Sequence, residues 1–241
     1  MPTSIELIID RQLRRWELER RAVAAPGAAV ERRPAAQPVI TVSRQHGSSG
    51  AAIATALAER FNYTLLHRDV IERMCESTGY ARRLLESLDE RAQSQLTSWF
   101  DSMLAGKYVD ASDYAVALLK TVHSIAQLGG VVVVGRGANF IVGLERGFHF
   151  RVVAPRDARV QGIMKRKGLP EKEAAREVDA RDHERADFIR KLFGRSVDDP
   201  HAYDLIVNEA CMSADSIVGF LAAAAREKFE ELRARAATRA G

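Results

Sequence analysis

A short strand, a glycine- and serine-rich turn and a helix follow one another between Pro38 and Phe61, and no other stretch constrains the fold as strongly. The β-branched run at 39–42 is typical of a buried strand, and apolar residues recur at helical spacing after residue 50. Small residues in the turn, SRQHGSSG at 43–50, let backbone N–H groups converge beside the partly positive N-terminus of the helix. The stretch therefore predicts a phosphate-binding loop, with an ordinary strand-to-helix turn as the alternative.

The turn departs from the common phosphate-binding pattern G-x-x-x-x-G-K-[ST]. Counted back from Gly50, the first glycine of that pattern falls on Gln45, the lysine on Ala51 and the hydroxyl residue on Ala52. If the loop holds phosphate, we expect the contacts to come from Gly47, Ser48, Ser49, Gly50, Ala51 and Ala52. The two serine hydroxyls have an alternative role, because serine commonly caps a helix N-terminus.

Strands alternate with helical segments along the chain, which predicts an α/β fold with a parallel sheet and helices on both faces. The valine run 131–134 is the clearest buried strand. Further strands are expected at 63–66, 148–153 and 203–208. Ligands of such sheets bind beyond the carboxyl ends of the strands. This rule brings three turns to one edge of the sheet, at 43–50, 67–69 and 135–137.

The charge pattern argues against nucleic-acid binding, although the chain of 241 residues has a formal net charge of +4. Only seven of its 36 basic residues are lysine, and the arginines alternate with Asp and Glu instead of clustering. We favour a solvated surface over one that attracts anionic substrates. No apolar run approaches a membrane span and the N-terminus is charged, so we expect no membrane partner and a cytoplasmic protein. Cys75 and Cys211 lack zinc or disulfide spacing, and we expect both to be buried.

Residues 1–24 are predicted to form a separate amphipathic helix, joined by a linker at 25–37 to a main domain at 38–235. Thr3 and Glu6 have the spacing of a capping box. The apolar stripe of this helix comprises Ile5, Ile8, Ile9, Leu13 and Trp16. Either a partner subunit covers the stripe, which would make the protein a homodimer, or its own domain does. Acidic residues on the polar face argue against a membrane surface.

Five segments of the chain are informative in combination: ITVSRQHGSSG (40–50), LLHRDVIERM (65–74), VVVVGRGANFI (131–141), RDHERADFIRKLFG (181–194) and DDPHAYDLIVN (198–208). Over residues 39–221 the chain resembles the cytidylate-kinase-like family of P-loop nucleotide kinases. The resemblance implies a P-loop kinase-like three-layer sandwich with a parallel sheet, a helical insertion that binds the base, and an arginine-rich lid. It also implies transfer of the γ-phosphoryl group of ATP, with Mg²⁺, to a nucleoside monophosphate such as CMP.

The chain also departs from the family's usual residues. Ala51 stands where members usually have Arg or Lys, and no lysine precedes Lys107. Leu66 and His67 replace a common tyrosine-aspartate pair, and Asp69 stands where a glutamate is more usual. These departures favour an alternative function, that of a degenerate member that binds a nucleotide or another phosphate ligand and acts as a regulator or scaffold.

Five charged residues are candidates for the chemistry that the resemblance implies. With position 51 apolar, Arg44 is the nearest cation in the loop, and a guanidinium suits phosphate; the alternative is a solvated turn residue. Arg136, between two glycines, is expected to contact phosphate; the alternative is a structural salt bridge. Arg181 and Arg185 lie one helical turn apart and are expected to neutralise the charge of the transferred group; the alternative is a solvated helix face. Asp69 is predicted to act as base or metal contact, or to cap a helix; the metal ligands stay open.

Overall fold

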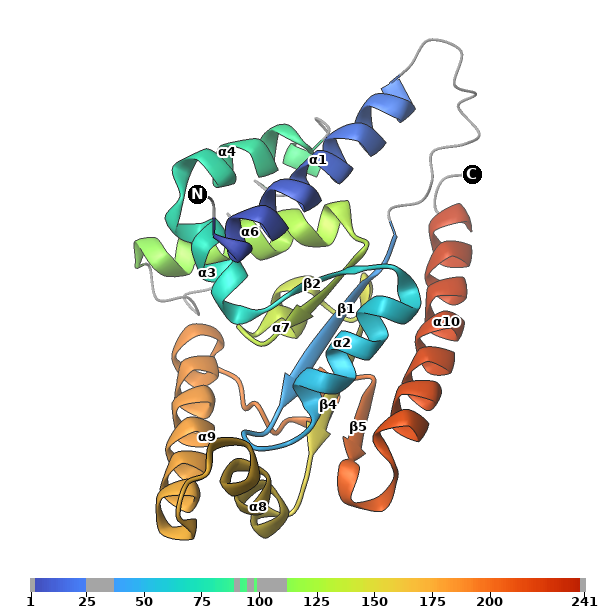
Figure 1. Ribbon diagram of the computed structural model, residues 1–241. Helices are drawn as coiled ribbons and strands as arrows, with labels where there is room; N and C mark the ends of the chain where they lie inside the picture. The colour runs from blue at the N-terminus through green and yellow to red at the C-terminus, as the bar shows by residue number, and fades with distance from the viewer. Residues whose placement is uncertain (1–2, 25–36, 89–91, 95–97, 99–111, 239–241) are drawn as a thin grey trace.

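A sheet of five parallel strands forms the centre of the computed structural model, which describes residues 3–24, 37–88, 92–94, 98 and 112–238 (Figure 1). Across the sheet the strands lie in the order β2-β3-β1-β4-β5. Their bounds are β1 Val39–Arg44, β2 Thr64–Leu66, β3 Val131–Val134, β4 Gly147–Val153 and β5 Leu205–Asn208. Every strand expected from the sequence is present, and no bound differs by more than about two residues.

Helices cover both faces of this sheet. α2 and α10 pack on one face, while α3, α6 and α7 pack on the other (Figure 1). The α-helices are α1 Ser4–Ala24, α2 Gly50–Phe61, α3 Arg68–Glu76, α4 Thr78–Glu86, α6 Asp113–Leu128, α7 Ala138–Val142, α8 Arg156–Lys167, α9 Glu171–Phe193 and α10 Ala214–Thr238. Short 3₁₀ helices are η2 Pro200–Ala202 and η3 Glu209–Cys211. Among the described helices, none is long and apolar enough to span a membrane.

The valine run of β3 shows why the sheet is covered on both faces. Val131 and Val133 belong to the apolar cluster that includes α3, α6 and α7, whereas Val132 and Val134 belong to the cluster with α2 and α10. Side chains alternate between the faces of a strand, so four consecutive buried valines require an apolar layer on each side. The predicted three-layer α/β sandwich is thereby confirmed.

The N-terminal helix α1 packs on its own subunit. Ile9, Leu13 and Trp16 are buried in the same cluster as α3 and α6, and the indole Nε1 of Trp16 donates a hydrogen bond to the carbonyl of Gly129 at 3.1 Å. The capping box is formed, because Thr3 N–H donates to a Glu6 carboxylate oxygen at 2.9 Å. Of the two alternatives for the apolar stripe, the structure shows the one in which the chain covers it itself. The apolar stripe therefore gives no argument for a homodimer.

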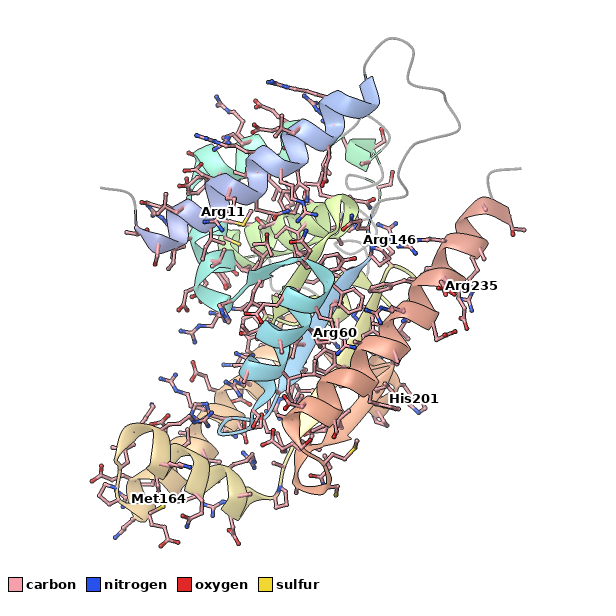
Figure 2. All side chains as sticks on the ribbon, turned by 45° about the vertical axis from the view of Figure 1, so that its right-hand side comes forward. Arg11, Arg60, Arg146, Met164, His201 and Arg235 are labelled. Carbon is pink, nitrogen blue, oxygen red and sulfur yellow. The ribbon has the colours of Figure 1, made fainter. Side chains whose placement is uncertain are left out.

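Residues 156–193 form a hairpin of α8 and α9 that projects from the sheet, and we call this hairpin the lid, after the arginine-rich lid that the family resemblance implies. Figure 2 shows the hairpin with Met164 labelled on α8, apart from the layers that cover the sheet. The hairpin has a small apolar cluster of its own, formed by Val160, Ile163, Ala174 and Val178. This cluster ties α8 to α9. The C-terminal end of α9 packs in the main core through Ile189, Leu192 and Phe193, whereas α8 and the first part of α9 meet the loop after β1 through polar contacts, which are described below.

The two cysteines lie in different environments. Cys75 on α3 is partly buried, but Cys211 is exposed, so the expectation that both are buried is wrong for Cys211. Cys211 ends the one-turn helix η3 after β5, and no residue of that helix is buried. Sequence spacing carries no information about such a position.

Candidate functional site

A cavity of about 420 Å³ lies at the carboxyl ends of β1, β2 and β3 and is closed on one side by α9. The charged residues that the sequence singled out all line it: Arg44, Asp69, Arg136, Arg181 and Arg185. The turns at 67–69 and 135–137 and the start of the turn at 43–50 therefore meet at one edge, as the rule for parallel sheets predicts. Because of its predominance of guanidinium groups, we call this cavity the arginine pocket.

Arg44 extends from the end of β1 across the pocket toward Gly135. A Cβ atom added at Gly135 would lie 2.5 Å from a terminal nitrogen of Arg44, so only glycine allows this approach. Burial, followed by the positive charges of Arg185, Arg68 and Arg136, lowers the pKa of Arg44 to about 10. Several guanidinium groups crowded together in this way favour an anionic ligand, which would offset their mutual repulsion.

Arg136 presents a buried hydrogen-bond donor to the pocket. Its backbone adopts a left-handed conformation with φ +53° between two glycines, an uncommon geometry for an arginine. The guanidinium lies 5.0 Å from the ring centroid of Phe188 and forms an ion pair with Glu72, yet its Nε is buried without a hydrogen-bond partner. The structural salt bridge is therefore present, and the phosphate contact stays a prediction, for which the Nε offers a free donor. A phosphate oxygen would satisfy that donor.

The two lid arginines, predicted as a pair, differ in their surroundings. The side chain of Arg185 is partly buried, and its Nη1 donates to the backbone carbonyl of Arg44 at 3.1 Å. Arg181 has a side chain that is 51% exposed and pairs with Glu184 at 2.7 Å. Arg185 is thus already held against the pocket, whereas Arg181 lies at its rim.

One face of α9 lines the pocket, and the spacing of the residues on that face can be predicted from the sequence. The pocket-lining residues of this helix are Arg181, Glu184, Arg185, Phe188 and Ile189. They recur at i, i+3, i+4, i+7 and i+8, the spacing of a single helix face. The sequence-based prediction used only the two arginines and missed the aromatic residue that contacts Arg136. It also missed Arg68, which lines the pocket after β2.

Asp69 lines the pocket but does not cap the helix. Position N-cap of α3 is His67, without a side-chain cap, and Asp69 lies in the first turn, so the capping alternative is wrong. Its side chain is 66% exposed and accepts a hydrogen bond from Arg68 Nε at 3.3 Å. No cluster of three or more His, Cys, Asp or Glu suited to a metal exists within the described residues. Asp69 suits only a Mg²⁺ ion that is held mainly by phosphate oxygens and water.

The predicted phosphate-binding loop lies beside the pocket, and its residues 47–52 do not line it. Ser48 Oγ donates to the carbonyl of Gln45 at 2.9 Å and accepts from the N–H of Gly50 at 3.3 Å. Ser49 is the N-cap residue of α2 but makes no side-chain cap, so capping by this serine is wrong. Both Ala51 and Ala52 are exposed in the first turn of the helix. The Ser48 hydroxyl therefore bonds both within the loop and to the first N–H of α2.

Helix α8 packs directly on the outside of this loop. A Cβ atom at Gly47, where φ is +92°, would lie 2.7 Å from the carbonyl oxygen of Arg159. Arg166 Nη2 donates to the carbonyl of Gly47 at 2.6 Å, and Arg159 Nη1 to that of His46 at 3.0 Å. Two arginines of the lid thus reach the loop that lacks a cation at Ala51. The sequence offered no signal for this packing, since the partners lie 113 and 119 residues apart.

The segment DDPHAYDL, part of the family resemblance, supports the pocket from outside. Asp198 pairs with Arg151 at 2.7 Å, and Arg151 Nη1 donates to Ser43 Oγ at 2.8 Å. Tyr203 Oη donates to the carbonyl of Val197 at 2.8 Å, while Asp204 accepts from the N–H of His149 at 2.7 Å. These contacts tie the segment to β4 and, through Arg151, to the end of β1, the strand that carries Arg44.

Gly50→Val is expected to weaken the binding of ATP or sulfate about ten-fold or more, with little change in secondary structure. A Cβ atom at this position would lie 2.6 Å from the Cβ of Arg44, so the side chain must displace Arg44 as well as obstruct the loop. Calorimetric titration and circular dichroism measure the two effects. Gly219→Val in α10 is the matched control, since a Cβ there meets nothing within 4 Å. Unchanged affinity in Gly50→Val would remove the loop from the site.

Comparison with known proteins gives two relatives by sequence. The chain is 25% identical over 187 residues to a cytidylate kinase from Pyrococcus horikoshii, covering 77% of this chain and 87% of the relative. It is 26% identical over 158 residues to a uronate isomerase from Corynebacterium glutamicum, covering 59% of this chain. That alignment spans only 30% of the isomerase.

Two further comparisons concern the fold and the family. The structure is similar to that of an uncharacterized protein from Eubacterium ventriosum, with a TM-score of 0.59 and 21% identity, over 77% of this chain and 98% of the other. At this identity the likeness shows the fold alone. The model of the Cytidylate kinase-like family matches residues 39–210, which is well over half of the chain and includes β1 to β5. The chain therefore belongs to the cytidylate kinase-like family.

Proposed function

We propose that the protein transfers the γ-phosphoryl group of ATP to a nucleoside monophosphate, with CMP or a similar pyrimidine nucleotide as acceptor. The arginine pocket carries this proposal, above all the buried and unpaired Nε of Arg136. A nucleoside monophosphate presents a dianionic phosphate that satisfies this donor and offsets the charge around Arg44. Family membership supports a kinase-like activity, and the cytidylate kinase of P. horikoshii supports the choice of acceptor.

We assign the residues of the pocket to separate roles in phosphoryl transfer. Arg136 and Arg44 bind and orient the acceptor phosphate from the ends of β3 and β1. Arg185 reaches the pocket from the lid and stabilises negative charge that is redistributed during transfer. Phe188 and Ile189 on the same face of α9 help to exclude water. When bound, ATP with Mg²⁺ would supply the transferable group, and Asp69, one of the two carboxylate residues that line the pocket, would contact the ion.

A second candidate function is that of a degenerate member which binds a nucleotide or another phosphate ligand as a regulator or scaffold. Two observations favour it: Ala51 is exposed and brings no cation to the loop, and two loop amides already bind carboxylates of this chain. Such a protein would keep the arginine pocket for recognition while phosphoryl transfer is lost.

A transfer assay with the full chain distinguishes the two functions. ATP consumption with Mg²⁺ is measured against CMP, UMP, AMP and GMP, while calorimetry measures the binding of each nucleotide. The kinase function predicts turnover with CMP preferred; binding of nucleotides without transfer to any acceptor would instead support the regulator. Ala51→Lys adds a second criterion. In an enzyme the new lysine is redundant or repulsive, whereas in a degenerate protein it raises phosphate affinity without creating turnover.

A further inference from the structure

The loop between β1 and α2 is already occupied by an acidic side chain of this protein. The N–H of Ser49 donates to a carboxylate oxygen of Glu209 at 2.7 Å. Glu209 opens the short helix η3 directly after β5, 160 residues away in the chain. A carboxylate bound to a backbone amide at a helix N-terminus lies where that terminus attracts anions. Like a phosphate group, the Glu209 carboxylate presents negative charge and hydrogen-bond acceptor oxygens to the loop.

A second carboxylate binds the same loop from the lid. The N–H of His46 donates to Asp182 Oδ1 at 2.7 Å, and the other oxygen of Asp182 accepts from Arg159 at 2.5 Å. His46 also bonds through its ring to Glu177 of α9 at 2.7 Å. Asp182 and Glu177 therefore bind His46 of the loop and hold α9 against the loop at the same time.

We propose that Glu209 and Asp182 are intramolecular competitors for the phosphate groups of the donor nucleotide. This inference rests on the proposed function, because it assumes that a nucleoside triphosphate uses the loop. A donor phosphate that binds the amides of His46 and Ser49 must first displace both carboxylates. The protein then binds its donor only in the fraction of molecules whose loop is free. If about one molecule in ten is free, the apparent Kd is about ten times weaker than the intrinsic value.

The competition is confined to the donor. Neither Glu209 nor Asp182 lines the arginine pocket, which we assign to the acceptor phosphate. Asp182 lies 3.8 Å from Arg185 of the pocket, so only Glu209 gives a selective test. Removing the charge of Glu209 should strengthen donor binding and leave acceptor binding as it was. This difference separates competition from a general electrostatic effect, which would strengthen the binding of every anion.

Glu209→Gln is the cleanest test, because it keeps the size of the side chain and removes its charge. A neutral amide oxygen accepts a hydrogen bond more weakly than a carboxylate, so the loop amide becomes easier to free. Calorimetric titration with Mg·ATP is expected to give a Kd about ten-fold lower than in the wild type, with the Kd for CMP unchanged. Glu230→Gln on the exposed side of α10 is the matched control, since it changes the net charge equally.

Asp182→Asn tests the second competitor, with Glu173→Gln on the exposed part of α9 as its control. Asp182 also pairs with Arg159, so thermal unfolding of this variant is measured first; if it fails to fold, Glu209→Gln alone decides. An ATP affinity that is unchanged or weaker in folded Glu209→Gln, while wild type binds ATP, overturns the inference and leaves the proposed function standing. Binding of CMP with no binding of ATP by wild type or any variant overturns the proposed donor, and the inference with it.

Discussion

Arg185→Ala is expected to lower the turnover of phosphoryl transfer about 100- to 1,000-fold, which corresponds to roughly 2.7–4 kcal/mol of transition-state stabilisation. The side chain is held against the pocket by its hydrogen bond to the carbonyl of Arg44, so it is already oriented toward the transferred group. Charge on that group is redistributed in the transition state, and a positioned guanidinium stabilises it there more than in the bound substrates. Steady-state kinetics with ATP and CMP measure kcat, and apparent nucleotide affinity should change less.

The neighbouring arginines of α9 provide the comparison. Arg181→Ala is expected to cost about ten-fold or less in kcat, because that side chain is half exposed and paired with Glu184. Arg190→Ala, whose side chain is 67% exposed and pairs with Asp187, should leave kcat unchanged. Equal losses in Arg185→Ala and Arg190→Ala would show that α9 acts only through its fold. A loss confined to nucleotide affinity would assign Arg185 to ground-state binding.

Trp16→Ala is expected to lower the free energy of unfolding by about 3–5 kcal/mol. The side chain is only 2% exposed, lies among residues of α3 and α6, and donates to the carbonyl of Gly129. Its removal leaves a large cavity and an unpaired carbonyl at the end of α6. Chemical denaturation followed by circular dichroism measures the change. Leu18→Ala on the same helix is the control, since that side chain is 65% exposed and should change stability little.

A deletion of residues 1–24 separates the two interpretations of α1. If the helix served chiefly as a dimerisation arm, removal of residues 1–24 would shift a homodimer to monomer and leave the subunit stable. With Ile9, Leu13 and Trp16 buried against their own domain, we expect the deletion to destabilise the subunit itself. Light scattering and thermal unfolding on the same samples distinguish these results: a stable monomer after deletion would contradict the packing described here.

Local sequence determined the sheet and most of the pocket. The valine run of β3 can be satisfied only with an apolar layer on each face, and its β-branched residues favour a strand. Parallel strands bring their carboxyl ends to one edge, so the positions of Asp69 and Arg136 in the chain already placed them together. The face of α9 could also be predicted, because helical spacing alone groups Arg181 with Arg185 and Phe188.

Only the tertiary structure decided what those residues contact. Arg44 was expected to serve the loop, but its side chain turns toward Gly135, because that glycine leaves room for it. Similarly, Cys211 and Cys75 look alike in the sequence and differ in exposure. The stripe of α1 required a cover, yet its spacing is the same whether a partner or its own domain provides it.

The loop shows the same limit most clearly. Its small residues predicted converging amides, and the structure confirms that two of them bind anionic groups, but the groups are Glu209 and Asp182 of the same chain. These carboxylates lie 160 and 136 residues from the amides they occupy, and they arrive through the register of β5 and the packing of the lid. The sequence by itself thus determined a loop suited to an anion. Which anion occupies it depends on long-range packing, for which local propensity and spacing carry no signal.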